Sequence, residues 1–455
     1  MCGFVGFVGG TDNQSEVLTK MMDRIVHRGP DMGGQFIDGR VALGFRRLSI
    51  LDLTEAGAQP MANEDGSVVI VVNGEIYNFQ ELRSELEAKG YKFHCGADTE
   101  SLLHGYEEWG EAVLDRLRGM YAFVIWDKKK NKLFGARDIF GIKPLYYYPM
   151  ADAGDGAPGV LFGSEIKSFL DYPHFHKAVN KKALRPYMTL QYSATEETFF
   201  EGVYKLPPAH YFTVDIPTGK MNIERYWDCD YSAVEKPFEE YVDELDEVVH
   251  ESVEAHRIAD VKVASFLSGG VDSSYIAACL MPDKTFSVGF DYKNFNETNY
   301  AKELSDKLGV ENVRKMITAD EFFGALEDIQ YHMDEPQSNL SSVPLWFLAE
   351  MAPSCFRAKV PTSFLAATPT TRTRSRSAST KRWCRCPFVV RSVTWRCICR
   401  TSRDITSWSR VPRSPRSRSW DRLWYGRSAR STACSSPSTT PATAPSSSLH
   451  PSTHA

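Results

Sequence analysis

The sequence predicts an α+β domain followed by an α/β domain in a chain of 455 residues. Up to about residue 205, short runs rich in Val, Phe and Tyr are interspersed with helical segments, a pattern typical of packed layers with mostly antiparallel strands. From about residue 237, strand and helix patterns alternate, which indicates a parallel sheet with crossover helices. Near residue 361 the composition changes abruptly, so the last segment needs a separate interpretation.

The first domain is expected over residues 1–205. Its predicted strands are short apolar runs bounded by Gly, Asp or Pro: Phe4–Val8, Val41–Phe45, Val68–Val72, Tyr121–Trp126, Lys132–Ala136, Pro144–Tyr148 and Val160–Ser164. Its predicted helices are Gln14–Ile25, Gln80–Lys89, Thr99–Trp109 and Glu111–Leu117.

Residues 206–236, which include Pro207 and Pro208, are expected to form a connecting segment. The second domain is expected over residues 237–360, as the N-terminal part of an α/β fold. Its predicted helices are Phe238–Ala255, Ser273–Leu280 and Glu297–Leu308, and its predicted strands are Val261–Leu267 and Thr285–Phe290.

Charge divides the chain in two. Residues 361–455 hold 16 Arg and 1 Lys against 2 Asp, so the first 360 residues carry −20 in a chain whose net charge is −5. The net charge of −5 argues against nucleic acid as the main partner. No stretch approaches the roughly 20 apolar residues of a membrane helix, and no secretory signal pattern is visible. We therefore expect a cytoplasmic protein without nucleic-acid or membrane partners, whose ten cysteines are reduced.

Cys2 directly follows the initiator methionine. Removal of Met1 would place a thiol and a free α-amine on one residue. The reference pKa values are about 8.5 for the thiol and about 7.7–8.0 for the amine. The amine can therefore accept the thiol proton near neutral pH. By itself a second-position cysteine is weak evidence for a nucleophile, because chance or a small buried residue also explains it.

Further motifs follow Cys2 in order along the first domain. They are His27-Arg28-Gly29-Pro30-Asp31, Arg46-Arg47-Leu48-Ser49-Ile50-Leu51-Asp52, Asn73-Gly74-Glu75-Ile76-Tyr77-Asn78, Cys95-Gly96-Ala97-Asp98-Thr99-Glu100, and Gly135-Ala136-Arg137-Asp138 with Gly141-Ile142-Lys143-Pro144-Leu145-Tyr146. With them, about the first 200 residues resemble the glutaminase domain of class II glutamine amidotransferases, and specifically that of asparagine synthetases. The resemblance implies an N-terminal-nucleophile fold with αββα layers. It also implies that Cys2 attacks the side-chain amide of glutamine, and that the Asn73 side chain and the Gly74 N–H form the oxyanion hole.

The same resemblance implies a glutamine-binding set. Arg47 would bind the α-carboxylate of glutamine in bidentate fashion, while Asp98 and Glu75 would receive its α-ammonium group. The other members implied are Leu48, Ser49, Ile50, Leu51, Asn73 and Gly74. Taken singly, Arg47 could equally well be a surface cation, and Asp98 could equally well be a helix N-cap, as residues that bind glutamine.

A second motif, Val263–Ser274, leads from an apolar strand through Ser-Gly-Gly into a helix. Glycines let backbone N–H groups approach an anion, and a helix N-terminus adds a favourable dipole. The motif lacks the lysine of the G-x-x-x-x-G-K-[ST] loop and resembles the pyrophosphate loop of ATP pyrophosphatases. ATP is then expected as a substrate, held by Ser268, Gly269, Gly270, Ser273 and Ser274.

The resemblance implies three further roles at the ATP site. Asp272 would bind Mg²⁺, a hard cation that prefers carboxylate oxygen, although Asp272 also fits the role of a helix cap. Leu267 and Val288 would contact adenine, although ordinary strand packing explains them too. Asp334-Glu335-Pro336 resembles the acidic segment of the family near its aspartate and metal site.

The resemblance stops after Val360. Members of the family continue with a Ser-Gly-x-Gly-x-Asp-Glu loop and a lysine for the α-phosphate. Here Arg, Ser, Thr, Trp and Cys follow without periodicity. Codons that encode Leu365–Arg372 can be chosen so that, read in the frame that starts at their third bases, they encode Ser-Gly-Asp-Ala-Asp-Asp-Glu. We therefore interpret residues 361–455 as a frameshifted, disordered and non-native tail, which resequencing through codon 361 tests.

Two other interpretations of the tail are weaker. Its Arg/Ser-rich composition is compatible with RNA binding. Its pairs Cys384/Cys386 and Cys397/Cys399 could bind zinc, but C-x-C is poor zinc spacing.

The two halves together predict glutamine-dependent asparagine synthesis. Ammonia from glutamine would attack β-aspartyl-AMP made from aspartate and ATP, giving asparagine, glutamate, AMP and PPi. The synthetase half is expected to be impaired in this chain. The expected partners are the small molecules glutamine, aspartate and ATP, and a homodimer is compatible with the sequence.

Three other functions stay open. The first is a glutaminase alone or another class II amidotransferase, such as a phosphoribosyl amidotransferase, although the Ser-Gly-Gly loop argues against the latter. The second is a β-lactam-forming synthetase, against which Cys2 argues. The third is a non-enzymatic binding protein built on the glutaminase fold.

Overall fold

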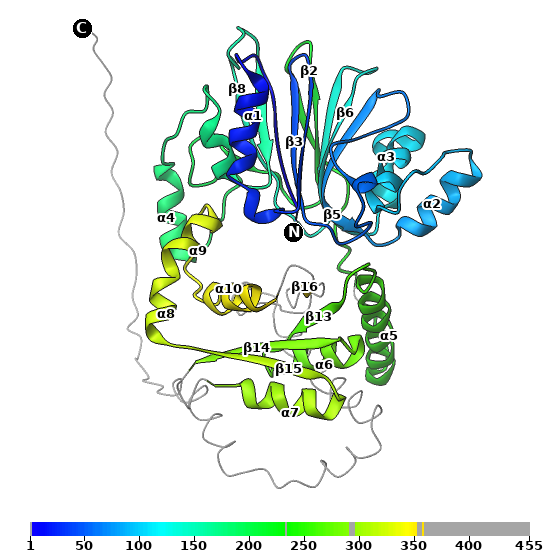
Figure 1. Cartoon of the computed structure of the whole chain (residues 1–455), viewed down its shortest axis with the longest axis vertical. Coiled ribbons are helices and arrows are strands. Elements are labelled where there is room, and N and C mark those ends of the chain that lie inside the picture. The colour runs from blue at the N-terminus through cyan, green and yellow to red at the C-terminus, as the bar shows by residue number, and fades with distance from the viewer. Residues whose placement is uncertain (1, 233, 291–295, 353–356, 359–455) are drawn as a thin grey trace, which may run out of the picture. The chain divides into compact units, whose positions relative to one another are not determined.

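The computed structural model describes residues 2–232, 234–290, 296–352 and 357–358 (Figure 1). The expectation of a disordered, non-native tail from residue 361 lies outside the described residues.

Two six-stranded antiparallel sheets form the first domain. One has the order β10-β8-β9-β1-β3-β2, with β1 Gly3–Val8, β2 Met32–Asp38, β3 Val41–Arg47, β8 Tyr146–Met150, β9 Gly159–Gly163 and β10 Tyr204–Lys205. The other has the order β12-β11-β7-β6-β5-β4, with β4 Met61–Ala62, β5 Val68–Ile76, β6 Gly119–Asp127, β7 Lys132–Arg137, β11 His210–Asp215 and β12 Met221–Arg225.

Helices cover the outer faces of these sheets (Figure 1). They are α1 Gln14–Asp23 on the first sheet, and α2 Phe79–Ala88 and α3 Asp98–Trp109 on the second, whereas α4 Lys181–Leu190 is largely exposed. The 3₁₀ helices are Val26–Arg28, Glu55–Gly57, Gly110–Arg116 and Ile166–Asp171. Phe4 of β1 and Val71 of β5 share the core between the sheets. Val5 packs with α1, and Ile70 packs with α2 and α3. Because successive strand residues point to opposite faces, both sheets are apolar on both sides, which confirms the predicted αββα layers.

The segment expected as a connection, residues 206–236, contributes two strands to the second sheet. β11 pairs with β7, and Phe212 and Val214 point into the core between the sheets. The partly exposed Tyr211 and Thr213 alternate with them, so the segment has the period of a half-buried strand. The predicted helix at Glu111–Leu117 is a 3₁₀ helix at Gly110–Arg116.

A four-stranded parallel sheet forms the second domain, as the alternating pattern predicted. Its order is β15-β14-β13-β16, with β13 Val263–Phe266, β14 Lys284–Phe290, β15 Glu311–Ile317 and β16 Arg357–Ala358. Its helices are α5 Phe238–His256, α6 Val271–Leu280, α7 Thr298–Leu308, α8 Ala319–Gly324, α9 Leu326–Met333 and α10 Ser342–Met351. In β14, Thr285 meets Ser305 of α7, whereas Val288 packs against α9 and α10. Within the described ranges, none of the helices has the length and apolar character needed to cross a membrane.

Candidate functional site

Three segments hold Cys2, which stands immediately before β1. Its Sγ accepts a hydrogen bond from the Leu48 N–H at 3.3 Å, and Arg28 Nε donates to its carbonyl oxygen at 3.0 Å. In the amide orientation that satisfies both neighbours, Asn73 Nδ2 donates to the same carbonyl at 2.9 Å and its Oδ1 accepts from Arg28 at 3.3 Å. Arg28 of the 3₁₀ helix Val26–Arg28 and Asn73 of β5 thus fix the backbone of Cys2, while Leu48, just after β3, holds its thiol.

The surroundings of Cys2 favour the neutral thiol. Burial raises the pKa of this thiol to about 11, with a further rise from Glu75 and a partial offset by the Leu48 N–H. At pH 7 a thiol with this pKa is protonated. A nucleophile at this position therefore needs a base beside it.

Cys2 lines a pocket of about 50 Å³ that contains most of the predicted glutamine-binding set. Its lining includes Arg47, Leu48, Ile50, Leu51, Asn73, Gly74, Glu75 and Asp98. Ser49 is absent from the lining, and its N–H donates to Asp31 Oδ2 at 2.8 Å. Residues of the lining to which no role was assigned from the sequence are Gly57, Gln59, Val72, Ala97, Thr99 and Lys143.

Arg47, at the end of β3, is 4% exposed and is therefore not a surface cation. Its guanidinium donates to the carbonyl oxygens of Thr54 at 2.6 Å and Leu51 at 3.4 Å, and also to that of Asp52. The loop that follows β3 thus wraps around the side chain of Arg47 and sets its orientation.

The pocket also encloses two carboxylates and an ammonium group. Glu75, Asp98 and Lys143 are all buried, and burial lowers the pKa of Lys143 to about 8 although Glu75 opposes this shift. Asp98 is the first residue of α3, but its Oδ2 accepts the Ile76 N–H at 2.7 Å and so joins α3 to the end of β5. Together with Arg47, these groups give the pocket the mixed charge that a zwitterionic amino acid requires.

Gly74 lies in β5 where no side chain fits. A Cβ there would clash with the Met120 carbonyl and would lie 2.7 Å from the Tyr121 Cα, in the neighbouring strand β6. The glycine therefore lets β5 and β6 pair closely beside Cys2.

The Ser-Gly-Gly loop of the second domain connects β13 to α6. Gly269 has φ of +81°, and a Cβ there would lie 2.8 Å from the Glu297 carbonyl at the start of α7. Ser268 Oγ and Ser273 Oγ are 2.9 Å apart, and the Gly270 N–H donates to Ser268 Oγ at 3.3 Å. The N-termini of α6 and α7 thus meet at this loop, an arrangement that favours anions.

The other predicted ATP-site residues fall into two groups. Asp272 is exposed in the first turn of α6, and Ser274 is half-buried beside it. Leu267 and Val288 use their side chains in packing, Leu267 against Ala277 and Val288 in the cluster of α9 and α10. Any contact of these two residues with adenine would therefore come from their backbones.

The acidic segment Asp334-Glu335 is paired with lysines of the first domain. Asp334 Oδ1 lies 2.9 Å from Lys167 Nζ, and Glu335 Oε2 lies 2.9 Å from Lys205 Nζ. Asp334 and Glu335, which the resemblance places near the aspartate and metal site of the family, are thus engaged in ion pairs with lysines.

Comparison with known proteins matches both domains. Residues 1–227 match the family model described as glutamine amidotransferase domain, and residues 244–358 match the one described as asparagine synthase. Over 361 residues the chain is 42% identical to asparagine synthetase [glutamine-hydrolyzing] 1 of Bacillus subtilis, covering 77% of this chain and 56% of the relative. It is 36% identical over 381 residues to a putative asparagine synthetase of Mycobacterium bovis, covering 77% and 57%.

The chain thus spans little more than half the length of these two relatives. It covers more of a third relative, putative asparagine synthetase [glutamine-hydrolyzing] 2 of Methanocaldococcus jannaschii. The two are 32% identical over 380 residues, covering 77% of this chain and 72% of the relative. The chain therefore belongs to the family of glutamine-hydrolysing asparagine synthetases.

Proposed function

We propose that the first domain hydrolyses glutamine and that the intact protein uses the ammonia to make asparagine. One observation carries the glutaminase half: Cys2 Sγ lines the same pocket as Arg47, Glu75 and Asp98. A nucleophile thus shares its pocket with the cation Arg47 and two carboxylates, which suit the charged ends of an amino acid.

Removal of Met1 would give the Cys2 thiol its base. The free α-amine takes the thiol proton, Sγ attacks the amide carbon, the C–N bond breaks, and ammonia leaves with the proton from the amine. Water then hydrolyses the glutamyl thioester, which yields glutamate and restores the thiol. The Asn73 amide and the Gly74 N–H are the proposed donors to the oxyanion.

The second domain would bind ATP at the loop Ser268–Ser274. The meeting of two helix N-termini at Gly269 supports this assignment. Asp272 fits Mg²⁺, because it is an exposed carboxylate beside the loop and Mg²⁺ takes its remaining ligands from water and phosphate. Bound there, Mg²⁺ would neutralise phosphate charge.

In the intact protein the β-carboxylate of aspartate would displace PPi from ATP to give β-aspartyl-AMP. Ammonia would then displace AMP to give asparagine. The loop and lysine with which the family is expected to continue do not follow Val360 in this sequence. We therefore expect glutamine hydrolysis to persist here while asparagine synthesis is impaired.

Substitution of the nucleophile tests the glutaminase half. Cys2→Ala should lower glutamate release from glutamine by roughly three orders of magnitude or more, because the covalent route is lost. Cys229→Ala is the matched control, since Cys229 lies outside the pocket, and its rate should equal that of wild type. Undiminished hydrolysis by Cys2→Ala would refute the proposal.

A further inference from the structure

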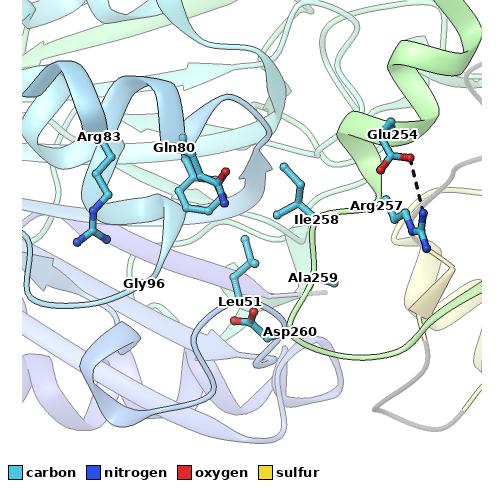
Figure 2. A pocket seen from close by; sticks show the side chains of 10 residues that line it. Leu51, Gln80, Arg83, Gly96, Glu254, Arg257, Ile258, Ala259 and Asp260 are labelled. Carbon is cyan, nitrogen blue, oxygen red and sulfur yellow. Dashed lines mark ion pairs between the residues drawn. The ribbon is translucent and has the colours of Figure 1, made fainter.

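A cavity of about 690 Å³ lies where the first domain meets the segment between α5 and β13. Figure 2 shows Leu51 of the first domain and Asp260 of this segment close together at its wall. Leu51 also lines the proposed glutamine pocket, so its side chain belongs to the walls of both the small pocket and the large cavity. The loop around Leu51 therefore faces the proposed glutamine site on one side and the second domain on the other.

Asp260 makes two hydrogen bonds to this loop. Its Oδ2 accepts the Asp52 N–H at 2.7 Å, and its own N–H donates to the Ile50 carbonyl at 3.1 Å. Both bonds join points about 210 residues apart in the sequence. The two bonds bracket Leu51 and fix the backbone of the loop Ile50–Asp52.

This loop in turn holds the proposed carboxylate-binding cation. The carbonyls of Leu51 and Asp52 both accept from Arg47. Asp52 has φ of +49°, a conformation that non-glycine residues adopt only at a cost. Two hydrogen bonds hold Asp52 in this conformation: its Oδ1 accepts the Thr54 N–H at 3.0 Å within the loop, and its own N–H donates to Asp260.

We propose that Asp260 is a positioning residue by which the second domain keeps the loop Ile50–Asp52, and through it Arg47, in the conformation that binds glutamine. The inference rests on the proposed glutaminase function. Glutamine affinity is then a property of both domains, although every residue that touches the substrate belongs to the first. The chemical step at Cys2 depends far less on Asp260, because Cys2 is held by Arg28, Leu48 and Asn73.

Steady-state kinetics of glutamine hydrolysis separate binding from chemistry. Asp260→Ala should raise KM for glutamine roughly three- to tenfold, the effect of losing one charge-assisted hydrogen bond at an exposed position, with kcat within about twofold of wild type. Asp260→Asn keeps an oxygen that can accept the Asp52 N–H, so its KM should lie within about twofold of wild type.

Asp283→Ala is the matched control. Asp283 Oδ2 also accepts a backbone N–H in the second domain, that of Val263 at 3.1 Å, but its partner is remote from the glutamine loop. Its KM should be unchanged. An equal rise of KM in Asp283→Ala would overturn the inference, because the effect would then be a general loosening of the second domain.

Calorimetric binding of glutamine in a Cys2→Ala background gives a readout that needs no hydrolysis. There, adding Asp260→Ala should weaken glutamine binding by the same roughly three- to tenfold factor. An unchanged affinity would overturn the role of Asp260. The proposed glutaminase function would still stand if Cys2→Ala alone had abolished turnover.

Discussion

Lys143 is a cation that the protein encloses beside its proposed nucleophile. The residue is 2% exposed, and burial lowers its pKa to about 8. An unfolded lysine has a pKa of about 10.4. Between these values the unfolded chain binds more protons than the folded chain, so stability from this group rises with pH. The sequence placed Lys143 in a motif, but it gave no sign of its burial or of the nearby charges of Glu75 and Arg28 that act on its pKa.

Replacing Lys143 isolates this effect. The free energy of unfolding of wild type, relative to Lys143→Met, should rise by roughly 2–3 kcal/mol as the pH increases from about 8 to about 10.5. Urea denaturation of both proteins across this pH range measures the difference. If the difference in the free energy of unfolding did not depend on pH, the pKa of Lys143 would not be lowered in the folded protein.

The elements predicted best are those whose two faces are both covered. Residues 68–72 of β5 are apolar throughout because they lie between the layer of α2 and α3 on one face and the sheet that contains β1 and β3 on the other. In contrast, β2 alternates between half-buried and exposed positions and contains Gly33-Gly34, and β12 is mostly exposed. Neither has a continuous apolar run, so the sequence did not predict them.

The motifs likewise predicted which residues line the proposed glutamine pocket better than they predicted its shape. Cys2, Asn73 and Arg47 stand in recognisable runs, and they all line the pocket. The wrapping of the loop around Arg47 needs Asp52 in a left-handed conformation, for which an Asp in the sequence is only a weak signal.

The loop between β13 and α6 offers a test of element geometry. Gly269→Ala should destabilise the protein by about 1–3 kcal/mol, because φ is +81° and the new Cβ would meet the start of α7. Gly270→Ala should change stability by less than about 0.5 kcal/mol, since its φ is −74° and its Cβ would meet only Ser268 Oγ at 3.3 Å. Urea denaturation compares the two, and equal losses would contradict the loop conformation.

At the scale of the whole molecule, buried charges link the two domains. Glu165 pairs with Arg28 at 2.8 Å and with Lys167 at 2.5 Å, and Lys167 also pairs with Asp334. Burial raises the pKa of Glu165, but His27, Arg28 and Lys167 lower it more, so that the pKa of this carboxyl falls to about 2. Asp334 lies 168 residues from its hydrogen-bond partner Ile166. No local pattern in the sequence could predict a contact across that separation.

Lys167 is the central cation of this cluster. Lys167→Met should lower the free energy of unfolding by about 3–5 kcal/mol, because it leaves two buried carboxylates without their shared partner. Lys205→Met breaks the more exposed pair with Glu335 and should cost about 1 kcal/mol or less. If urea denaturation showed equal losses of unfolding free energy in the two variants, the ion pairs of Lys167 would not specially stabilise the contact between the two domains.

The central claim is that the free α-amine of Cys2 serves as the base for its own thiol. The state of the N-terminus tests this claim most directly. Intact-mass spectrometry gives the fraction of molecules that begin at Cys2 in preparations processed to different extents, and glutamate release from glutamine gives the rate of each. If the α-amine is the base for a thiol whose pKa burial otherwise raises to about 11, the rate should be proportional to that fraction. Equal rates in preparations that retain Met1 would contradict the account.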